Sequence, residues 1–208
     1  AAFVGDPAAM DTVSADDLLD PAYLERRAAD IDPARARPAV AGAPRRGGTV
    51  YLAAADADGM MVSFIQSNFD GFGSGVVIPG TGISLQNRAT GFTLAEGHPN
   101  EAAGGKRPLH TIIPAMLKRD GQVVTAYGVM GGAYQPCGHA RVLSNMVDFG
   151  MEPQAAIDAP RCFAADGELS MERGYDESVR AELSALGHKI STPVTPIGGS
   201  QMVVIDRK

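Results

Sequence analysis

The sequence has few cysteines and no excess of positive charge. Its two cysteines, Cys137 and Cys162, lack the CxxC spacing that is typical of zinc sites. We therefore expect no metal site, and two buried free thiols in preference to a disulfide. The 18 basic and 24 acidic residues give a net charge of -6. This charge argues against nucleic acid as a partner, because phosphate binding needs a basic patch.

Long hydrophobic runs are also absent. No stretch approaches the roughly 18 apolar residues that span a bilayer, so we expect no membrane partner. The opening residues AAFVGDPAAMD contain neither a basic region nor a long apolar core, so they predict no signal peptide. The chain starts without methionine and ends on Asp206-Arg207-Lys208, from which we expect a processed or trimmed piece. The compartment stays open between a bacterial cytoplasm and a periplasm.

The strongest boundary in the sequence is residues 33–48, which contain mostly Pro, Ala, Arg and Gly without periodicity and therefore predict a linker. Before it, residues 14–31 are expected to be helical. Ser14 is a candidate N-cap, and Asp20-Pro21 is typical of a second helix start.

After the linker the sequence predicts strands in hairpins. Residues 49–55 and 60–67 flank the turn 56–59, and they are apolar at nearly every position, so both faces should be buried. A short strand is expected near residues 82–86, and a second hairpin over residues 110–129.

Helices are expected between and after these hairpins. The predicted helices cover residues 134–149, a short segment from Pro153, and residues 176–186, and a last strand covers residues 202–205. Antiparallel hairpins with interspersed helices indicate an α+β fold. Strongly apolar sheets need cover on both faces, so we predict a helix–sheet–sheet–helix sandwich.

The junction Gly48-Thr49, where the linker meets the first strand, has two interpretations. Threonine is favoured in strands, so an ordinary strand-initial residue is one. The other is an N-terminal nucleophile, whose hydroxyl attacks while its α-amine, freed by cleavage of the preceding bond, acts as the base. Position alone favours the first interpretation.

Six further stretches, taken in order, decide between them: GGTVYLAAADADG, FGSG, GISLQN, GGKRPLHTIIP, GVMGG and DFGMEPQAAIDAPR. Together they resemble the γ-glutamyltranspeptidase family of N-terminal nucleophile hydrolases, whose fold is a four-layer αββα sandwich with antiparallel sheets. The resemblance implies that residues 1–48 form the end of a large subunit plus the linker up to the cleavage site. It implies that residues 49–208 are the small, catalytic subunit without its closing segment.

The resemblance also implies roles for individual residues. The bond between Gly48 and Thr49 would be cut by the chain itself, and Thr49 would then attack the substrate amide. Ser67 matches a second hydroxyl that orients the nucleophile, although a polar residue at a strand end is an equal alternative. Gly131 and Gly132 match the pair whose N–H groups form an oxyanion hole, where the alternative is a plain strand-to-helix turn. The chemistry implies no metal and no organic cofactor.

Four residues are implied to bind substrate: Asn87, Arg88, His110 and Thr111. The last two replace a serine pair of the family. The alternative for His110 is a structural histidine in a strand.

The chain departs from the family at the amine-binding position. The acid that binds the α-amine of a γ-glutamyl group is replaced by Gly91, Phe69 stands where a polar residue is expected, and Arg88 adds positive charge. Such a pocket favours an acyl group that carries only a carboxylate, such as glutaryl. The alternative for Arg88 is a solvent-facing side chain.

The function predicted from this resemblance is a self-processing threonine amidohydrolase or transferase that acts on γ-glutamyl or related acyl amides of the glutathione type. Its partners would be that small-molecule substrate and the remainder of the large subunit, in a heterodimer made from one precursor or a dimer of such heterodimers. The alternatives are a glutaryl or cephalosporin-type acylase, and a catalytically incomplete fragment with the same fold. A pure binding module is supported only by the acidic charge and the glycine-rich loops.

Overall fold

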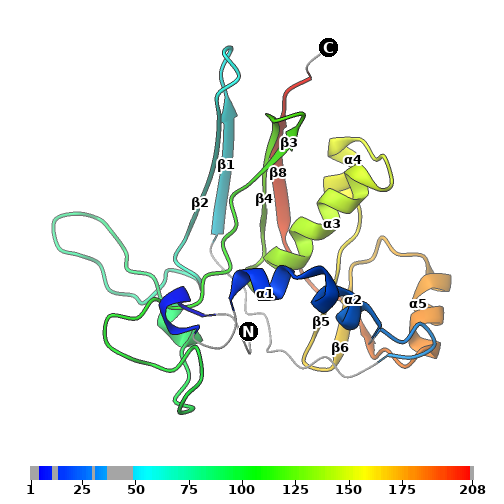
Figure 1. The fold of residues 1–208 in the computed structure, drawn as a ribbon, viewed down its shortest axis with the longest axis horizontal. Coiled ribbons are helices and arrows are strands. Elements are labelled where there is room, and N and C mark those ends of the chain that lie inside the picture. The colour runs from blue at the N-terminus through cyan, green and yellow to red at the C-terminus, as the bar shows by residue number, and fades with distance from the viewer. Residues whose placement is uncertain (1–4, 11–13, 30, 37–48, 207–208) are drawn as a thin grey trace.

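The computed structural model describes residues 5–10, 14–29, 31–36 and 49–206. Most of the predicted linker, and with it Gly48, lies outside the described residues. The described part contains three sheets and a set of short helices, arranged as Figure 1 shows.

The N-terminal segment contains a 3-10 turn, η1 (Pro7–Ala9), and two helices, α1 (Ala15–Leu19) and α2 (Pro21–Ala29). Ser14 caps α1 as expected, because its Oγ accepts from the backbone N–H of Asp17 at 3.1 Å. The second helix start predicted at Asp20-Pro21 is also confirmed, because α2 begins at Pro21 and the Asp20 carboxylate accepts from the N–H of Tyr23 at 2.8 Å.

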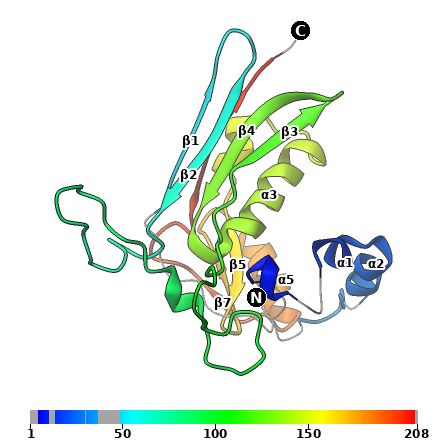
Figure 2. The same ribbon diagram turned by 60° about the vertical axis from the view of Figure 1, so that its left-hand side comes forward.

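The first predicted hairpin is confirmed as β1 (Thr49–Ala55) and β2 (Met61–Ser67), with Thr49 opposite Ser67. Its expected burial on both faces is wrong. The inner face carries Tyr51, whereas Leu52 is 47% exposed and Phe64 is 49% exposed on the outer face. No helix of the described residues covers that outer face, as Figure 2 shows.

The second sheet has the antiparallel order β3 (Ala115–Arg119), β4 (Gln122–Met130) and β8 (Gly199–Val204). The second predicted hairpin is confirmed from residue 115 onward, whereas residues 110–114 are not in a strand.

The hairpin packs face to face on this second sheet through Tyr51. A Cβ placed at Gly128, in the middle of β4, would overlap the Tyr51 ring. The Tyr51 hydroxyl lies 2.8 Å from Ser63 Oγ on β2, which fixes the ring between the two sheets. Gly128 is therefore the depression in β4 that accepts the ring.

Helix α3 (Gln135–Val147) covers the other face of the second sheet, and α4 (Pro153–Asp158) follows it (Figures 1 and 2). The core between the second sheet and α3 contains Tyr127, Val129, Tyr134 and Val142. The predicted α+β sandwich is confirmed, and the described residues form its sheet, sheet and helix layers.

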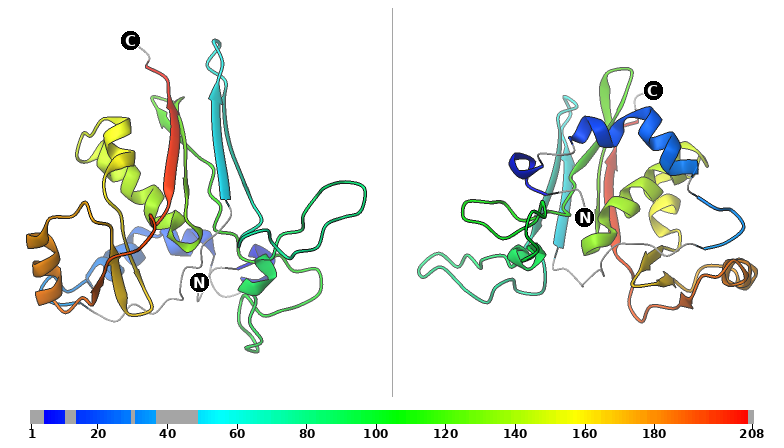
Figure 3. Two further views of the ribbon diagram at one scale, coloured as in Figure 1. Left: turned by 180° about the vertical axis from the view of Figure 1, so that it is seen from behind. Right: turned by 60° about the horizontal axis from the view of Figure 1, so that its bottom comes forward.

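A third sheet that the sequence did not predict lies beside these layers (Figure 3). It contains β5 (Cys162–Ala165), β6 (Glu168–Met171) and β7 (Ile190–Ser191), and α5 (Glu177–Ala185) connects β6 to β7. The pair β6–β7 is parallel, an exception to the antiparallel prediction.

Residues 68–114 are largely irregular, apart from a 3-10 turn, η2 (Arg88–Gly91). The strand expected near residues 82–86 is reduced to a single bridge between Val77 and Ser84. Both cysteines are free as predicted, but their predicted burial is wrong, because Cys137 is exposed and Cys162 is only half-buried. Among the described residues, no helix is long and apolar enough to cross a membrane.

The contact between the sheets predicts the effect of a substitution at Gly128. We expect Gly128→Ala to destabilise the folded state by about 1–3 kcal/mol, because the new methyl group forces the Tyr51 ring out of place. Thermal unfolding of the full-length protein measures this. Gly104→Ala is the matched control, because a Cβ there meets open space; equal melting temperatures for the two variants would contradict the packing argument.

Candidate active site

The two hydroxyl residues predicted for the site are in direct contact. Thr49 begins β1 and Ser67 ends β2, and the antiparallel register places them opposite each other. Thr49 Oγ1 donates a hydrogen bond to Ser67 Oγ at 2.9 Å. Both side chains share the inner face with Tyr51, because alternate residues of a strand point to the same side. The hairpin therefore aims both hydroxyls toward the second sheet.

Ser67 is held from a second side by Phe69. The backbone N–H of Phe69 donates to Ser67 Oγ at 2.9 Å, so this oxygen accepts two hydrogen bonds and keeps its own proton to donate. Phe69 has φ of 78°, which is rare and strained for a bulky residue. A strained backbone conformation of this kind persists only where the surrounding structure holds it in place, and such residues are common at functional sites.

The predicted glycine pair lies at the same end of the two sheets as Thr49. Strand β4 runs opposite to β1, and the Tyr51–Gly128 contact sets their overlap, so the start of β1 lies toward the residues that follow Met130 (Figure 1). Gly131 has φ of 140° and Gly132 has φ of 59°. A Cβ at Gly131 would come within 2.7 Å of the carbonyl oxygen of Ile197. Glycine at 131 is required by both the backbone angle and the space.

The glycine pair leads directly into helical structure. The 3-10 turn η3 (Gly132–Tyr134) precedes α3, so the backbone N–H groups that open this helix lie beside the pair. Helix N-termini carry partial positive charge and stabilise anions. The strand-to-helix turn and the oxyanion-hole interpretation are thus compatible here.

A cavity of about 700 Å³ opens beside Gly131. Apolar side chains of Tyr134 and Phe163 line one side, and the loop 193–199 lines the other. A small organic group adjoining the glycine pair would fit this space.

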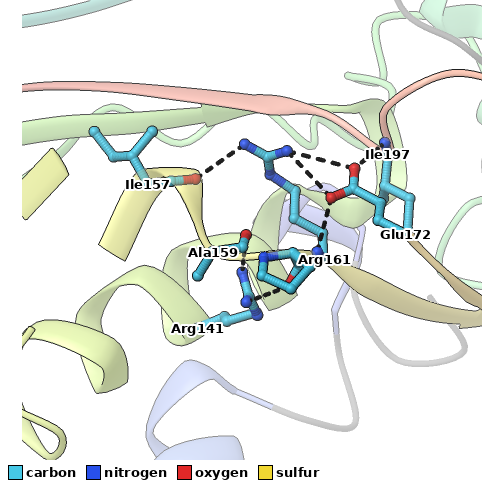
Figure 4. Close-up of polar contacts among 7 residues, drawn as sticks. Arg141, Ile157, Ala159, Arg161, Glu172 and Ile197 are labelled. Atoms are coloured by element: carbon cyan, nitrogen blue, oxygen red, sulfur yellow. Dashed lines mark hydrogen bonds and ion pairs between the residues drawn. The ribbon is translucent and has the colours of Figure 1, made fainter. Parts of the chain in front are cut away.

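Glu172 holds the loop that lines this cavity, as Figure 4 shows. Its Oε1 accepts from the backbone N–H of Ile197 at 2.8 Å, and its Oε2 accepts from the N–H of Arg161 at 2.8 Å. The Arg161 guanidinium lies 3.4 Å from the carboxylate, and both side chains are 15% exposed. The carbonyl of Ile197 lies where a side chain at position 131 would project, so Glu172 holds a residue that adjoins the glycine pair.

Asn87 fastens the loop that follows β2. Its Oδ1 accepts from the N–H of Asp70 at 3.0 Å, and its Nδ2 donates to the Asp70 carbonyl at 3.3 Å. In this structure its side chain therefore binds backbone.

Arg88 is buried, with 2% of its surface exposed, so its solvent-facing alternative is wrong. Its Cζ lies 5.3 Å from the centroid of the Phe69 ring, a cation–π contact. Nη1 and Nη2 find no hydrogen-bond partner within the described part of the chain. Burial lowers the pKa of the Arg88 guanidinium, but arginine stays charged in proteins.

His110 and Thr111 lie in different environments. His110 is exposed and lies outside any strand, and its Nδ1 is 2.8 Å from the Pro108 carbonyl, so the strand alternative for it is wrong. The Thr111 hydroxyl is buried without a partner among the described residues. The carbonyl of Thr111 lies 2.8 Å from the amide nitrogen of Gln135 when that amide is oriented to donate. Thr111, and not His110, is thus linked to the start of α3.

Sequence reasoning missed Gln135 and Glu172. Gln135 is fully buried, and its amide also lies 3.1 Å from the Val129 carbonyl, so it joins the end of β4 to the Thr111 segment. Its position directly after the glycine-rich turn was the only signal. In the described ranges, no group of three or more His, Cys, Asp or Glu side chains is placed to hold a metal ion.

The fold is that of the N-terminal nucleophile hydrolases, as the similarity to solved structures shows. A family model described as gamma-glutamyltranspeptidase matches residues 1–208. The chain belongs to the γ-glutamyltranspeptidase family.

Sequence similarity to named proteins supports this assignment to the family. The chain is 42% identical over 164 residues to the glutathione hydrolase-like YwrD proenzyme of Bacillus subtilis, covering 77% of this chain and 30% of that protein. It is 37% identical over 195 residues to the oxamate amidohydrolase proenzyme of Klebsiella pneumoniae, covering 91% and 37%. The chain thus spans about a third of the length of these relatives.

Similarity to solved structures supports the same family assignment. A cephalosporin acylase from Bacillus halodurans superposes with a TM-score of 0.88 at 42% identity, covering 99% of this chain and 38% of that one. A γ-glutamyltranspeptidase chain from Pseudomonas nitroreducens gives a TM-score of 0.68 at 26% identity, covering 75% and 89%.

The Glu172 contacts predict a local and a global effect. We expect Glu172→Ala to free the Ile197 N–H and leave Arg161 without its partner, destabilising the fold by about 2 kcal/mol. Hydrogen exchange at the Ile197 amide should accelerate more than exchange in β4. Glu182→Ala, at an exposed position of α5, is the control and should change neither quantity. Unchanged protection at Ile197 in Glu172→Ala would contradict the positioning role.

Proposed function

We propose that the protein to which this chain belongs is a self-processing threonine amidohydrolase or acyltransferase, with Thr49 as its nucleophile. The observation that carries the proposal is the 2.9 Å hydrogen bond between the hydroxyls of Thr49 and Ser67 on the inner face of the first hairpin. A strand-initial threonine with no special role needs no such partner. The glycine pair and the cavity at the same end of the sheets supply the other parts of an acyl-transfer site.

The self-processing step releases the nucleophile. The Thr49 hydroxyl attacks the carbonyl carbon of residue 48, and the peptide C–N bond breaks as an ester forms to Thr49 Oγ1. Water then hydrolyses the ester, leaving a carboxylate on Gly48 and a free α-amine on Thr49. Cleavage divides the chain into residues 1–48, the end of a large subunit, and residues 49–208, most of a small subunit. The match of three quarters of this chain to most of the P. nitroreducens chain supports this division.

In the processed protein the α-amine of Thr49 takes the hydroxyl proton while Oγ1 attacks the substrate amide. Ser67 orients Oγ1. The N–H groups of Gly131 and Gly132 bind the developing oxyanion, an interaction that contributes about 3 kcal/mol per donor in such sites. The amine product leaves with the proton, and the acyl group passes from Thr49 to water or to another amine.

The substrate is a small acyl amide. The names of the relatives describe a glutathione hydrolase-like protein, an oxamate amidohydrolase and a cephalosporin acylase, which have amide cleavage in common. Asn87, Arg88 and Thr111 are the residues we place at the substrate, and His110, which is exposed, is the outermost of the predicted set. The remaining large-subunit residues complete the site, and the exposed outer face of the hairpin supports their packing there.

Substitution of Thr49 tests the proposal. Expressed as the full-length protein, the wild type should separate into two chains, the smaller beginning at Thr49, and should hydrolyse an acyl anilide. Thr49→Ala should stay uncut and inactive, whereas Thr49→Ser keeps a hydroxyl and should retain slow cleavage. Intact mass and N-terminal sequencing measure this. Cleavage at the same bond in Thr49→Ala would refute the proposal.

Substitution of Ser67 tests the orienting contact. We expect Ser67→Ala to slow both cleavage and turnover about fivefold, since a hydrogen bond contributes about 1 kcal/mol and 1.4 kcal/mol corresponds to a factor of about ten. Ser67→Thr keeps the hydroxyl and should stay near the wild-type rate. Ser184→Ala, which removes the hydroxyl of an exposed serine in α5, is the control, and an equal loss there would contradict a specific role for Ser67.

A further inference from the structure

Gln135 is a fully buried side chain at the start of α3, beside the glycine pair of the proposed oxyanion hole. Its amide nitrogen lies 3.1 Å from the Val129 carbonyl oxygen and 2.8 Å from the Thr111 carbonyl oxygen. The opposite orientation of the amide would set its oxygen against these two acceptors, so the nitrogen donates to both. One amide group thus joins the end of β4 to the segment that contains Thr111.

This amide lies where the pairing of β3 with β4 has ended. The register stops at Ala115 opposite Tyr127, and residues 110–114 are not in a strand. Val129 lies beyond that last pair, toward the glycine pair. A buried backbone carbonyl needs a hydrogen-bond donor, and β3 supplies none beyond Ala115. The Gln135 side chain therefore replaces the strand pairing at the point where the two segments separate.

The glycine pair depends on its neighbours for a fixed conformation, because glycine has more backbone freedom than any other residue. The Gly131 carbonyl accepts a hydrogen bond from the N–H of Tyr134 at 3.1 Å, and the Gly132 carbonyl accepts one from the backbone N–H of Gln135. Gln135 thus binds the chain on both sides of the pair. Its main chain holds the second glycine, and its side chain holds Val129, which precedes the first.

Helix α3 leaves this connection little freedom to move. A Cβ at Gly138, one turn after Gln135, would come within 2.6 Å of a methyl carbon of Val129, so the helix approaches β4 closely there. The Nδ1 atom of His139 lies 2.7 Å from the Gln135 carbonyl oxygen. The amide is therefore presented by a tightly packed helix turn, which is the kind of support that holds a reactive geometry in place.

We propose that Gln135 is a positioning residue for the oxyanion hole: by holding the two carbonyls, its side-chain amide sets the direction of the N–H groups of the glycine pair. This inference rests on the proposed function, because it assumes that the pair binds the oxyanion formed when Thr49 attacks. The oxyanion develops only on the way to the transition state, so a misaligned pair slows turnover without weakening substrate binding.

Two variants of similar size test the inference on the full-length protein. Gln135→Met fills the space without a polar group, and Gln135→Glu, assayed near pH 8, keeps the shape but as a carboxylate offers no donor. Both should still be cut before Thr49, and turnover is expressed per cut chain. Loss of one oxyanion-hole donor lowers kcat about 100- to 1000-fold. Because a misaligned pair keeps part of its effect, we expect kcat to fall roughly 30-fold and KM to stay within about threefold.

Two acyl groups separate a positioning role from a role in shaping the substrate pocket. Glutaryl p-nitroanilide and γ-glutamyl p-nitroanilide share the leaving group and the carbonyl on which the oxyanion forms, and they differ at the far end of the acyl group. The loss of kcat in each variant should therefore agree within about twofold between the two compounds. Where only one of them is a substrate, the split between kcat and KM on that compound decides.

Two control variants complete the design. Val142→Ala removes buried volume further along α3 and lowers stability without touching the hydrogen bonds of Gln135, so its kcat should stay within about twofold of the wild type. Gln154→Met makes the same chemical change at an exposed position of α4 and should alter neither kcat nor stability. Thermal unfolding of all four variants shows whether activity follows stability.

Each remaining outcome overturns the inference. It is overturned by an unchanged kcat in Gln135→Met or Gln135→Glu, by a loss confined to KM, or by unequal losses on the two acyl groups. It is also overturned if both variants fail to fold or stay uncut, because Gln135 would then serve the fold as a whole, or if Val142→Ala loses as much kcat. Failure of the proposed function has a different signature, in which the wild type itself is not cut before Thr49 and hydrolyses neither anilide.

Discussion

The Tyr51 ring packed into the depression at Gly128 is the contact on which the arrangement of the site depends. It fixes the first hairpin on the second sheet, and because β1 and β4 run in opposite directions, it brings Thr49 to the end where the glycine pair follows Met130. The hydrogen bond between the hydroxyls of Tyr51 and Ser63 holds the same ring against β2, the strand that ends in Ser67. Core packing and the position of the reactive hydroxyls are thus set by one side chain.

Within the described residues, the second sheet is covered by a helix, whereas the outer face of the first hairpin is not covered. Tyr127, Val129, Tyr134 and Val142 form a closed core between the second sheet and α3, whereas Leu52 and Phe64 expose apolar surface on the outer face of the hairpin. The same asymmetry appears at the site, where Thr49 and Ser67 are paired but the Arg88 guanidinium is not. Both observations agree with a chain that spans about a third of the length of these relatives.

The sequence predicted the layered α+β fold, the first hairpin and the contact of Thr49 with Ser67, because these follow from local pattern and from ordered motifs. It did not predict the sheet of β5, β6 and β7, whose strands are of two to four residues and depend on distant pairing. The burial of Arg88 could not be predicted from the sequence either, because a charged residue in a polar loop is usually exposed. Glu172 was missed since its partner, the Ile197 N–H, is 25 positions away and is backbone.

The central claim is that Thr49 Oγ1 forms a covalent ester with the acyl group during turnover. Full-length protein, mixed with a slowly turned-over acyl anilide and quenched in acid within the first turnover, should yield a peptide beginning at Thr49 whose mass is increased by the acyl group. Fragmentation should place the added mass on Thr49. An acyl group found on a different residue, or steady release of the aniline with no adduct at any quench time, would contradict the account.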